Sequence, residues 1–399
     1  MSPLPIDPHI VYPIYFWGIF ITCVFLYFNY SGSNNCDKLL SKNSMVPALL
    51  LTLLLVVFMG LRPISGRFGD TVNYAYVYRN MPAQPAIFAV DFDKEWLWAF
   101  IMNTCKAAHL TVSGWFLIIA IGYLGFVFIG LRILLGENSW MAMLFFLSAF
   151  STFSFGTNGI RNGCACSLAI LAFAIAAHQN VARLAAAGGV LILAFGIHRS
   201  TSLPIAAFIV ASYLIKSPKT AIYFWIASIG ISLVAGGAAT NFFAGLGFDD
   251  RMSSYATSTE NTHQFSHTGF RWDFLLYSAM PVWLAWYVTK KAETERALYG
   301  DTTEETETNI TGAGRIADAH SMRVFNILAT TYILANSFWV MVIRASFSNR
   351  FAYLSWFLYP VVIAYGVIRL HIWEDQDKKA GLILLAHAGF TFVMYLLGK

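Results

Sequence analysis

Apolar residues in this chain form long continuous runs, and polar residues gather in the segments between them. Alternation would indicate strands, whereas runs of about 20 apolar residues match helices that cross a hydrocarbon core about 30 Å thick. Backbone polar groups in lipid must be bonded internally, which leaves helices or a closed barrel. We therefore predict an all-α polytopic integral membrane protein, with a single transmembrane domain over residues 1–399. Its roughly twelve spans lie near 9–29, 46–63, 114–131, 140–156, 161–178, 182–198, 200–215, 220–245, 272–289, 323–343, 350–369 and 380–397.

Composition supports the membrane class, because 57% of the residues are hydrophobic and only 12% are charged. The first residues, "MSPLPIDPHIVYPIYFWGIF", contain neither a basic segment nor a small-residue cleavage site. We interpret them as the first span, not as a removable signal peptide. The five cysteines are scattered, and the pair Cys164 and Cys166 lacks zinc or thioredoxin spacing. We expect packing cysteines and neither metal nor cofactor.

Three long connections separate the spans. Residues 64–113 and 246–271 are rich in aromatic residues, glycine and mixed charge, whereas 290–322 is polar and nearly free of aromatics. The last composition is typical of a flexible solvent loop. If this loop is cytoplasmic, alternation places 14 of the 26 lysines and arginines inside and 12 outside, so 64–113 and 246–271 are periplasmic.

The kind of basic residue differs between the two sides. The inner set contains eight lysines and six arginines, and the outer set contains nine arginines and three lysines. Arginine presents a planar fork that binds phosphate in two places. The arginine-rich outer side therefore indicates anion binding, against the alternative that these residues cap helices or pair with local acids.

The outer ends of the spans carry residues suited to group transfer from a lipid pyrophosphate. Cations would hold the diphosphate and stabilise its developing charge, and a carboxylate or imidazole would take a proton from the attacking hydroxyl. Aromatic side chains would stack on sugar rings. The candidates are Arg62, Arg161, Arg271 and Arg350 for the pyrophosphate, Asp70, Glu95 and His198 for catalysis, and Tyr74, Trp96 and Tyr353 for the sugar or acceptor.

The choice of base stays open among the three candidates. Asp70 can instead pair with Arg67, Glu95 can cap the helix that follows it, and His198 can be a neutral histidine bonded to backbone at a tight turn. Arg161 and Arg350 each begin a helix, whose positive end also favours phosphate.

Five segments resemble the EpsG-like polysaccharide polymerases, which are related in role to the Wzy O-antigen polymerases. "GLRPISGRFGDTVNYAYVY" resembles the family's first signature, and four others follow in the family's order between residues 60 and 365: "EWLWAFIMNTCK", "IRNGCACSLAILAFA", "GIHRSTSLPI" and "NRFAYLSWFLYPVVI". Two departures stand out. Asn162 replaces the family's glutamine, and Arg199 places a charge between His198 and the following serine.

The resemblance implies a GT-C-like glycosyltransferase in the bacterial inner membrane, with its active site facing the periplasm. It would join repeat units by an inverting or a retaining route. The growing chain on undecaprenyl pyrophosphate would be the donor, and a single repeat unit on the same lipid the acceptor. Membrane lipid and a chain-length regulator are the expected partners, and nucleic acid is not. By position, the family pattern places Arg62, Asp70, Tyr74, Glu95, Arg161, His198, Arg350 and Tyr353 in the site.

Two other functions compete with polymerisation. A transporter or flippase for lipid-linked oligosaccharide would place ionisable residues near the membrane midplane, often in repeated halves. Here the middles of the spans are almost wholly apolar. A membrane acyltransferase would need a histidine within a span as its base, for which His198 qualifies, but the set of arginines would have less to do. The pattern favours chemistry on one face.

Overall fold

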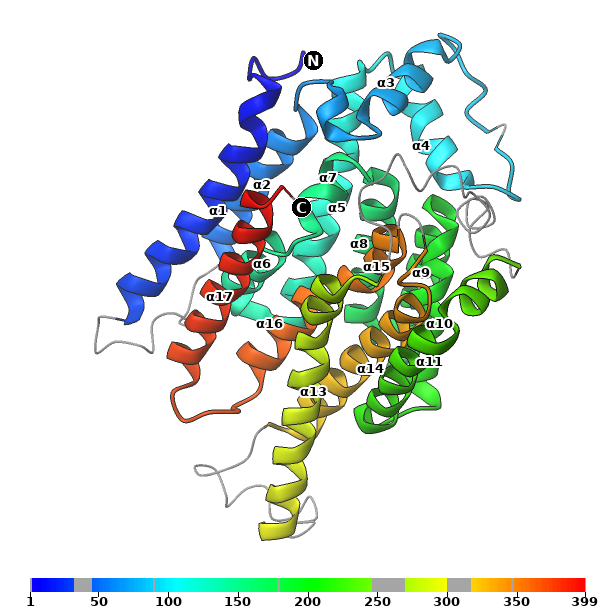
Figure 1. Ribbon diagram of the computed structural model, residues 1–399. Helices are drawn as coiled ribbons and strands as arrows, with labels where there is room; N and C mark the ends of the chain where they lie inside the picture. Colours follow the sequence, from blue (N-terminus) through cyan, green and yellow to red (C-terminus); the bar gives the residue numbers. More distant parts are fainter. Residues whose placement is uncertain are drawn as a thin grey trace. The chain divides into compact units, whose positions relative to one another are not determined.

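The computed structural model describes residues 2–31, 45–88, 90–177, 180–245, 270–299, 317–345 and 348–398, and every regular element in these ranges is helical (Figure 1). The predicted loop 246–271 lies outside them except for its last two residues. Residues 300–316 of the predicted loop 290–322 also lie outside, while α13 extends to Tyr299 and α14 begins at Ala319. Helices therefore occupy part of each end of that predicted loop.

Each of the twelve predicted segments coincides with a helix or with two consecutive helices. The matching helices are α1 (Pro8–Ser31), α2 (Met45–Gly60), α5 (Val112–Leu135), α6 (Ser139–Leu147) with α7 (Thr152–Thr157), α8 (Ile160–Ala176), α9 (Val181–Ile197), α10 (Ser202–Tyr213), α11 (Pro218–Gly245), α13 (Trp272–Tyr299), α14 (Ala319–Met341), α15 (Ser348–Trp356) with α16 (Tyr359–Arg369), and α17 (Gln376–Leu396).

Six stretches in the described ranges are long and apolar enough to cross a membrane: Pro8–Phe28, Val112–Leu147, Pro218–Ala238, Ala319–Met341, Arg350–Arg369 and Gln376–Leu396. Three shorter apolar helices accompany them, and two of these, α8 and α9, have 17 residues each. A span needs roughly 17–25 apolar residues. A multi-pass membrane protein follows from these helices, and the number twelve stays a prediction.

Two predicted spans are interrupted for local reasons. The segment 140–156 breaks between α6 and α7, where the Ser148 hydroxyl donates to the carbonyl of Phe145 at 3.3 Å and competes with the helical bonds. The segment 350–369 breaks between α15 and α16, where Pro360 lies in the first turn of α16. Proline lacks an N–H, so Pro360 cannot donate to the carbonyl of Trp356, the last residue of α15, and the helical hydrogen bonds are interrupted there.

The predicted loop 64–113 contains the short helix η2 (Gly66–Phe68), then α3 (Thr71–Asn80) and α4 (Trp96–Ala107). Tyr78 of α3 stacks on Trp115 of α5 with ring centroids 4.8 Å apart, and Trp98 of α4 lies 5.5 Å from the same indole. These rings are buried. The aromatic residues of this segment therefore include core residues that hold α3 and α4 on α5.

Contacts divide the chain into two compact units, and the single transmembrane domain stays a prediction. The first unit comprises Met1–Ile205 and Asp377–Lys399, and the second comprises Ala206–Gln376. In the first unit α5 packs against α2 and α8, and α8 packs against α9. In the second unit α14 packs against α11, α13, α15 and α16.

Candidate functional site

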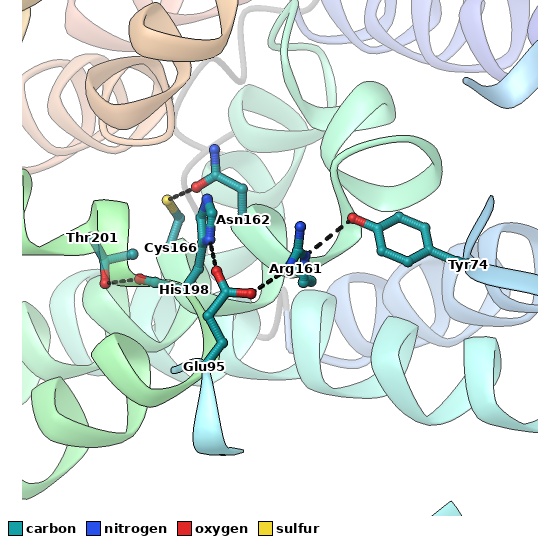
Figure 2. Close-up of polar contacts among 7 residues, drawn as sticks. All are labelled: Tyr74, Glu95, Arg161, Asn162, Cys166, His198 and Thr201. Carbon is teal, nitrogen blue, oxygen red and sulfur yellow. Dashed lines mark hydrogen bonds and ion pairs between the residues drawn. The ribbon is translucent and has the colours of Figure 1, made fainter. Parts of the chain in front are cut away.

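Three segments of the first unit bring polar side chains together (Figure 2). Glu95 directly precedes α4, Arg161 is in the first turn of α8, and His198 directly follows α9. All three positions lie where an apolar helix begins or ends, so a polar side chain can leave the helix packing. We call Glu95, Arg161 and His198 the polar cluster.

The Glu95 carboxylate is the centre of the polar cluster. Its Oε2 accepts a hydrogen bond from Nη1 of Arg161, and its Oε1 contacts Nδ1 of His198. Nε of Arg161 donates to the hydroxyl of Tyr74 at 3.4 Å. The three side chains of the cluster are 20–23% exposed. The cluster is therefore partly accessible from outside the fold.

The charge of Glu95 determines which nitrogen of His198 carries a proton. Burial alone would raise the pKa of the Glu95 carboxyl, but the contacts with His198 and Arg161 hold this pKa below its usual value. An ionised carboxylate only accepts hydrogen bonds, so Nδ1 of His198 must be the donor. In the neutral imidazole, Nε2 then carries the lone pair. Figure 2 shows this second ring nitrogen on the side of the imidazole away from Glu95.

Neighbouring residues keep the polar cluster in place. The backbone N–H of His198 donates to the carbonyl of Ala194 at 3.1 Å, and the hydroxyl of Thr201 donates to the carbonyl of His198 at 2.6 Å. Trp96 packs against Gly196 of α9 so closely that a Cβ at Gly196 would lie 2.5 Å from Cε2 of the indole. Trp96, expected to bind sugar, thus also fixes the start of α4 on α9.

Tyr74, also expected to bind sugar, bonds Arg161 and lies against buried aromatic rings. Its ring centroid is 5.9 Å from that of Trp98 and 6.4 Å from that of Trp115. Burial raises the pKa of the Tyr74 hydroxyl, which outweighs the opposing effect of Arg161. Tyr74 is therefore a neutral phenol that supports Arg161.

Asn162 is a polar residue near the cluster that was not among the sequence candidates. Its Oδ1 accepts a hydrogen bond from the thiol of Cys166 at 3.1 Å, one turn further along α8 (Figure 2). The spacing of four residues on a predicted helix was the available signal. Cys166 has a packing role, as expected, and a polar contact as well.

Arg62 lies in the interior of the first unit with 1% of its surface exposed. Its guanidinium donates to the carbonyls of Met59 and Thr157, both at 2.7 Å, and to the hydroxyl of Thr71 at 2.9 Å. Its Cζ lies 4.6 Å from the ring centroid of Phe116. Arg62 thus connects the end of α2 to the start of α3 and to the end of α7, and none of these bonds reaches the polar cluster.

Asp70 lies directly before α3, and its role as a base stays a prediction. Its backbone N–H donates to Oδ1 of Asn158 at 2.9 Å. The preceding Gly69 has φ +57°, and a Cβ there would lie 2.3 Å from the same oxygen. Glycine is required for this approach. These contacts hold the 61–71 segment on the turn that leads to Arg161.

The other three sequence candidates belong to the second unit. Arg271 forms a bidentate pair with Asp273, with Nε–Oδ1 3.0 Å and Nη2–Oδ2 2.8 Å, and its Cζ lies 3.6 Å from the ring centroid of Phe274. Arg350 is half-buried in the first turn of α15, and the ring of Tyr353 is 5.8 Å from that of Trp356. Their proposed roles in substrate binding stay predictions.

The polar cluster has the parts of a general-base site. A carboxylate orients an imidazole and stabilises the cation formed when Nε2 takes a proton. Nη2 of Arg161 has no hydrogen-bond partner in the described part of the chain and remains available to an anion. Across the described ranges, no group of three or more His, Cys, Asp or Glu residues is arranged to hold a metal ion.

Comparison with known proteins gives one match. The model of a family described as the EpsG family matches residues 45–398, which include every candidate residue discussed above. No curated protein and no solved structure matches the chain.

Proposed function

The chain belongs to the EpsG family, the family of Wzy-type polysaccharide polymerases, and on this premise we propose that the polar cluster catalyses glycosyl transfer between lipid-linked oligosaccharides. The family match and the apolar helices support a polysaccharide polymerase-type membrane protein at the coarse level. The proposal adds the site, the roles of its residues and the kind of substrate.

In the proposed reaction, His198 is the general base. Nε2 of His198 takes the proton from a sugar hydroxyl of the acceptor as that oxygen attacks the anomeric carbon of the donor. The new glycosidic C–O bond forms, and the bond between the anomeric carbon and the phosphate oxygen breaks. Its electron pair leaves with the lipid diphosphate. Glu95 stabilises the resulting imidazolium through Nδ1, as a triad carboxylate does.

Arg161 has two tasks in this proposal. Nη1 holds Glu95, and Nη2 binds an oxygen of the diphosphate where negative charge develops as the bond breaks. The donor is the growing chain on undecaprenyl pyrophosphate, and the acceptor is a repeat unit on the same lipid. We place the reaction at the periplasmic face of the bacterial inner membrane, in line with the arginine-rich outer side predicted from the sequence.

The observation that carries the proposal is the shared carboxylate of Glu95, which contacts both Arg161 and His198. A histidine that only capped a helix would not need an ionised partner. An arginine that only anchored a helix to the membrane surface would point to solvent and not toward an imidazole-bound carboxylate. Together these groups supply a base and an anion contact at one partly exposed place.

The test is elongation of a purified lipid-linked repeat unit by the purified protein, with neither ATP nor a nucleotide sugar present. We expect wild type to form longer chains, and His198→Gln to slow the reaction by about 10²- to 10⁴-fold, the usual contribution of a general base. The exposed His9→Gln is the matched control and should react like wild type. Undiminished elongation by His198→Gln, or none by wild type, would overturn the proposal.

A further inference from the structure

The polar cluster carries too little positive charge for the diphosphate it is proposed to release. Glu95 is ionised and pairs with Arg161, so the two formal charges cancel. A lipid diphosphate gains negative charge as the sugar leaves it, and catalysis needs positive charge at that position. The missing charge must come from a cation that no carboxylate neutralises.

Three other arginines were assigned to the diphosphate from the sequence: Arg271 and Arg350 belong to the second unit, and Arg62 and Arg271 are already engaged. Arg62 is buried, and its guanidinium bonds two carbonyls and a hydroxyl of the protein. Arg271 is paired with Asp273 through two hydrogen bonds. Neither presents an unneutralised, accessible guanidinium.

Arg199 does present one, and it directly follows His198. It begins the short helix η4 (Arg199–Thr201), and its side chain is exposed. In the described part of the chain its guanidinium has no hydrogen bond and no ion pair, and its Cζ lies 5.9 Å from the ring centroid of Phe195. An aromatic face attracts a cation without cancelling its charge.

The backbone around Arg199 is fixed relative to the polar cluster. The N–H of Thr201 donates to the carbonyl of His198 at 3.1 Å, and the Thr201 hydroxyl donates to the same oxygen. On the other side, the N–H of His198 is bonded within α9. The backbone is therefore hydrogen-bonded on both sides of Arg199. These bonds fix the Arg199 backbone next to that of His198.

The charge of Arg199 also acts on the segment that leads to Glu95. The pKa of Asp91 is lowered, chiefly by the N–H of Asp93 and by Lys94, and the more distant charge of Arg199 adds to this effect. Lys94, the other cation there, is paired with Asp91 at 3.2 Å. Arg199 is thus an exposed cation next to His198 whose charge acts on the segment that leads to Glu95, and it has no ion pair in the part of the chain that the structure describes.

We propose that Arg199 binds the diphosphate of the lipid-linked substrate and supplies the positive charge that Arg161 shares with Glu95. This inference rests on the proposed function and names a binding residue for the same site. The side chain reaches the diphosphate from the His198 side and can bind two of its oxygens with the guanidinium fork. The phosphate contacts of the site are then Arg161 and Arg199.

Binding of inorganic pyrophosphate tests this role separately from turnover. Isothermal titration of the detergent-solubilised full-length chain should show pyrophosphate binding by wild type. We expect Arg199→Gln to weaken this binding roughly 10- to 100-fold, the usual range for loss of a charge-assisted bidentate contact. Arg199→Lys should recover part of it. Arg183→Gln, an exposed arginine at the other end of α9, should bind like wild type.

In the elongation assay, Arg199→Gln should raise KM for the lipid-linked repeat unit and the inhibition constant of pyrophosphate by a similar factor, and more so at low salt. Equal pyrophosphate binding by Arg199→Gln and wild type would overturn the assignment of Arg199, even if wild type elongates normally. Absence of elongation by wild type, with pyrophosphate binding that depends on Arg199, would overturn the proposed function alone.

Discussion

Replacing Glu95 by glutamine keeps the size of the side chain and removes its charge and one of its two acceptor oxygens. Arg161 and His198 are both donors toward Glu95. A glutamine has one acceptor oxygen and one donor NH₂ group, so it can accept from only one of them. If Arg161 keeps the oxygen, His198 faces an N–H and must carry its proton on Nε2, where it can no longer act as a base.

The size of the effect follows from this geometry. A triad histidine held in the wrong tautomer loses about 10⁴-fold in rate, and general-base catalysis as a whole contributes about 10²- to 10⁴-fold. We therefore expect kcat of Glu95→Gln to fall by about 10²- to 10⁴-fold. The unfolding free energy should fall by only about 1 kcal/mol, because the groups left unpaired are partly exposed and water can reach them.

The pH dependence of stability gives a second reading of the same substitution. The folded protein lowers the pKa of Glu95, so the contribution of this carboxylate to stability is fully present above its unfolded value of about 4.3. The contribution is lost as the pH falls through the lower folded value. The stability difference between wild type and Glu95→Gln should therefore stay constant above about pH 5 and shrink below it.

The assay is single-turnover elongation of the lipid-linked repeat unit, together with thermal unfolding in the same detergent. Glu137→Gln, an exposed carboxylate at η3 (Gly136–Asn138), is the matched control and should keep the wild-type rate. A rate for Glu95→Gln within about threefold of wild type would refute the reasoning, because the base would then not depend on an ionised partner.

Three further substitutions probe the surroundings of the polar cluster. Tyr74→Phe should slow elongation by less than about fivefold, because the bond it removes is long, at 3.4 Å; a larger loss in steady-state kinetics would assign the phenol to the substrate. Gly196→Ala should displace Trp96, slow elongation by about tenfold and lower the unfolding free energy by about 1–3 kcal/mol. Gly188→Ala, in open space on the same helix, is the control: it should keep the wild-type elongation rate and leave the unfolding free energy unchanged or higher. Arg62→Met should lower the unfolding free energy by about 1–3 kcal/mol, because the buried carbonyl of Met59 loses its side-chain donor while that of Thr157 keeps only the Thr71 hydroxyl. An inactive variant with wild-type stability would return this arginine to the substrate site.

Hydropathy was sufficient to predict the twelve segments that coincide with helices, because each apolar run needs a helix in lipid whatever its neighbours are. The predicted segment 380–397 and α17, for example, cover nearly the same residues. Hydropathy did not predict α3 and α4, which lie in the predicted loop 64–113. Hydropathy could not predict the helix breaks at Ser148 and before Pro360, because the residues around them are as apolar as those within the helices. These breaks depend on local bonding and backbone geometry.

The polar cluster was predictable in its members but not in its arrangement. Arg161, Glu95 and His198 were each candidates by residue type and position, but 66 residues separate Glu95 from Arg161 and 103 separate it from His198. No local pattern reports that one carboxylate contacts both. Arg62 was also a candidate by its position after a span, and the fold buries it with hydrogen bonds to two carbonyls, which its position in the sequence did not indicate.

Because Trp96 packs against Gly196, the position of the Glu95 carboxylate does not depend on the residues that precede it in the chain. Residues 82–88 and 90–94 run between α3 and α4 without regular helix or strand, and most of their side chains are exposed. Glu95 is held from its other side, by α4 and by the polar cluster. Substitutions in this stretch should therefore leave the geometry of the polar cluster in place, because the contacts that hold Glu95 lie outside it.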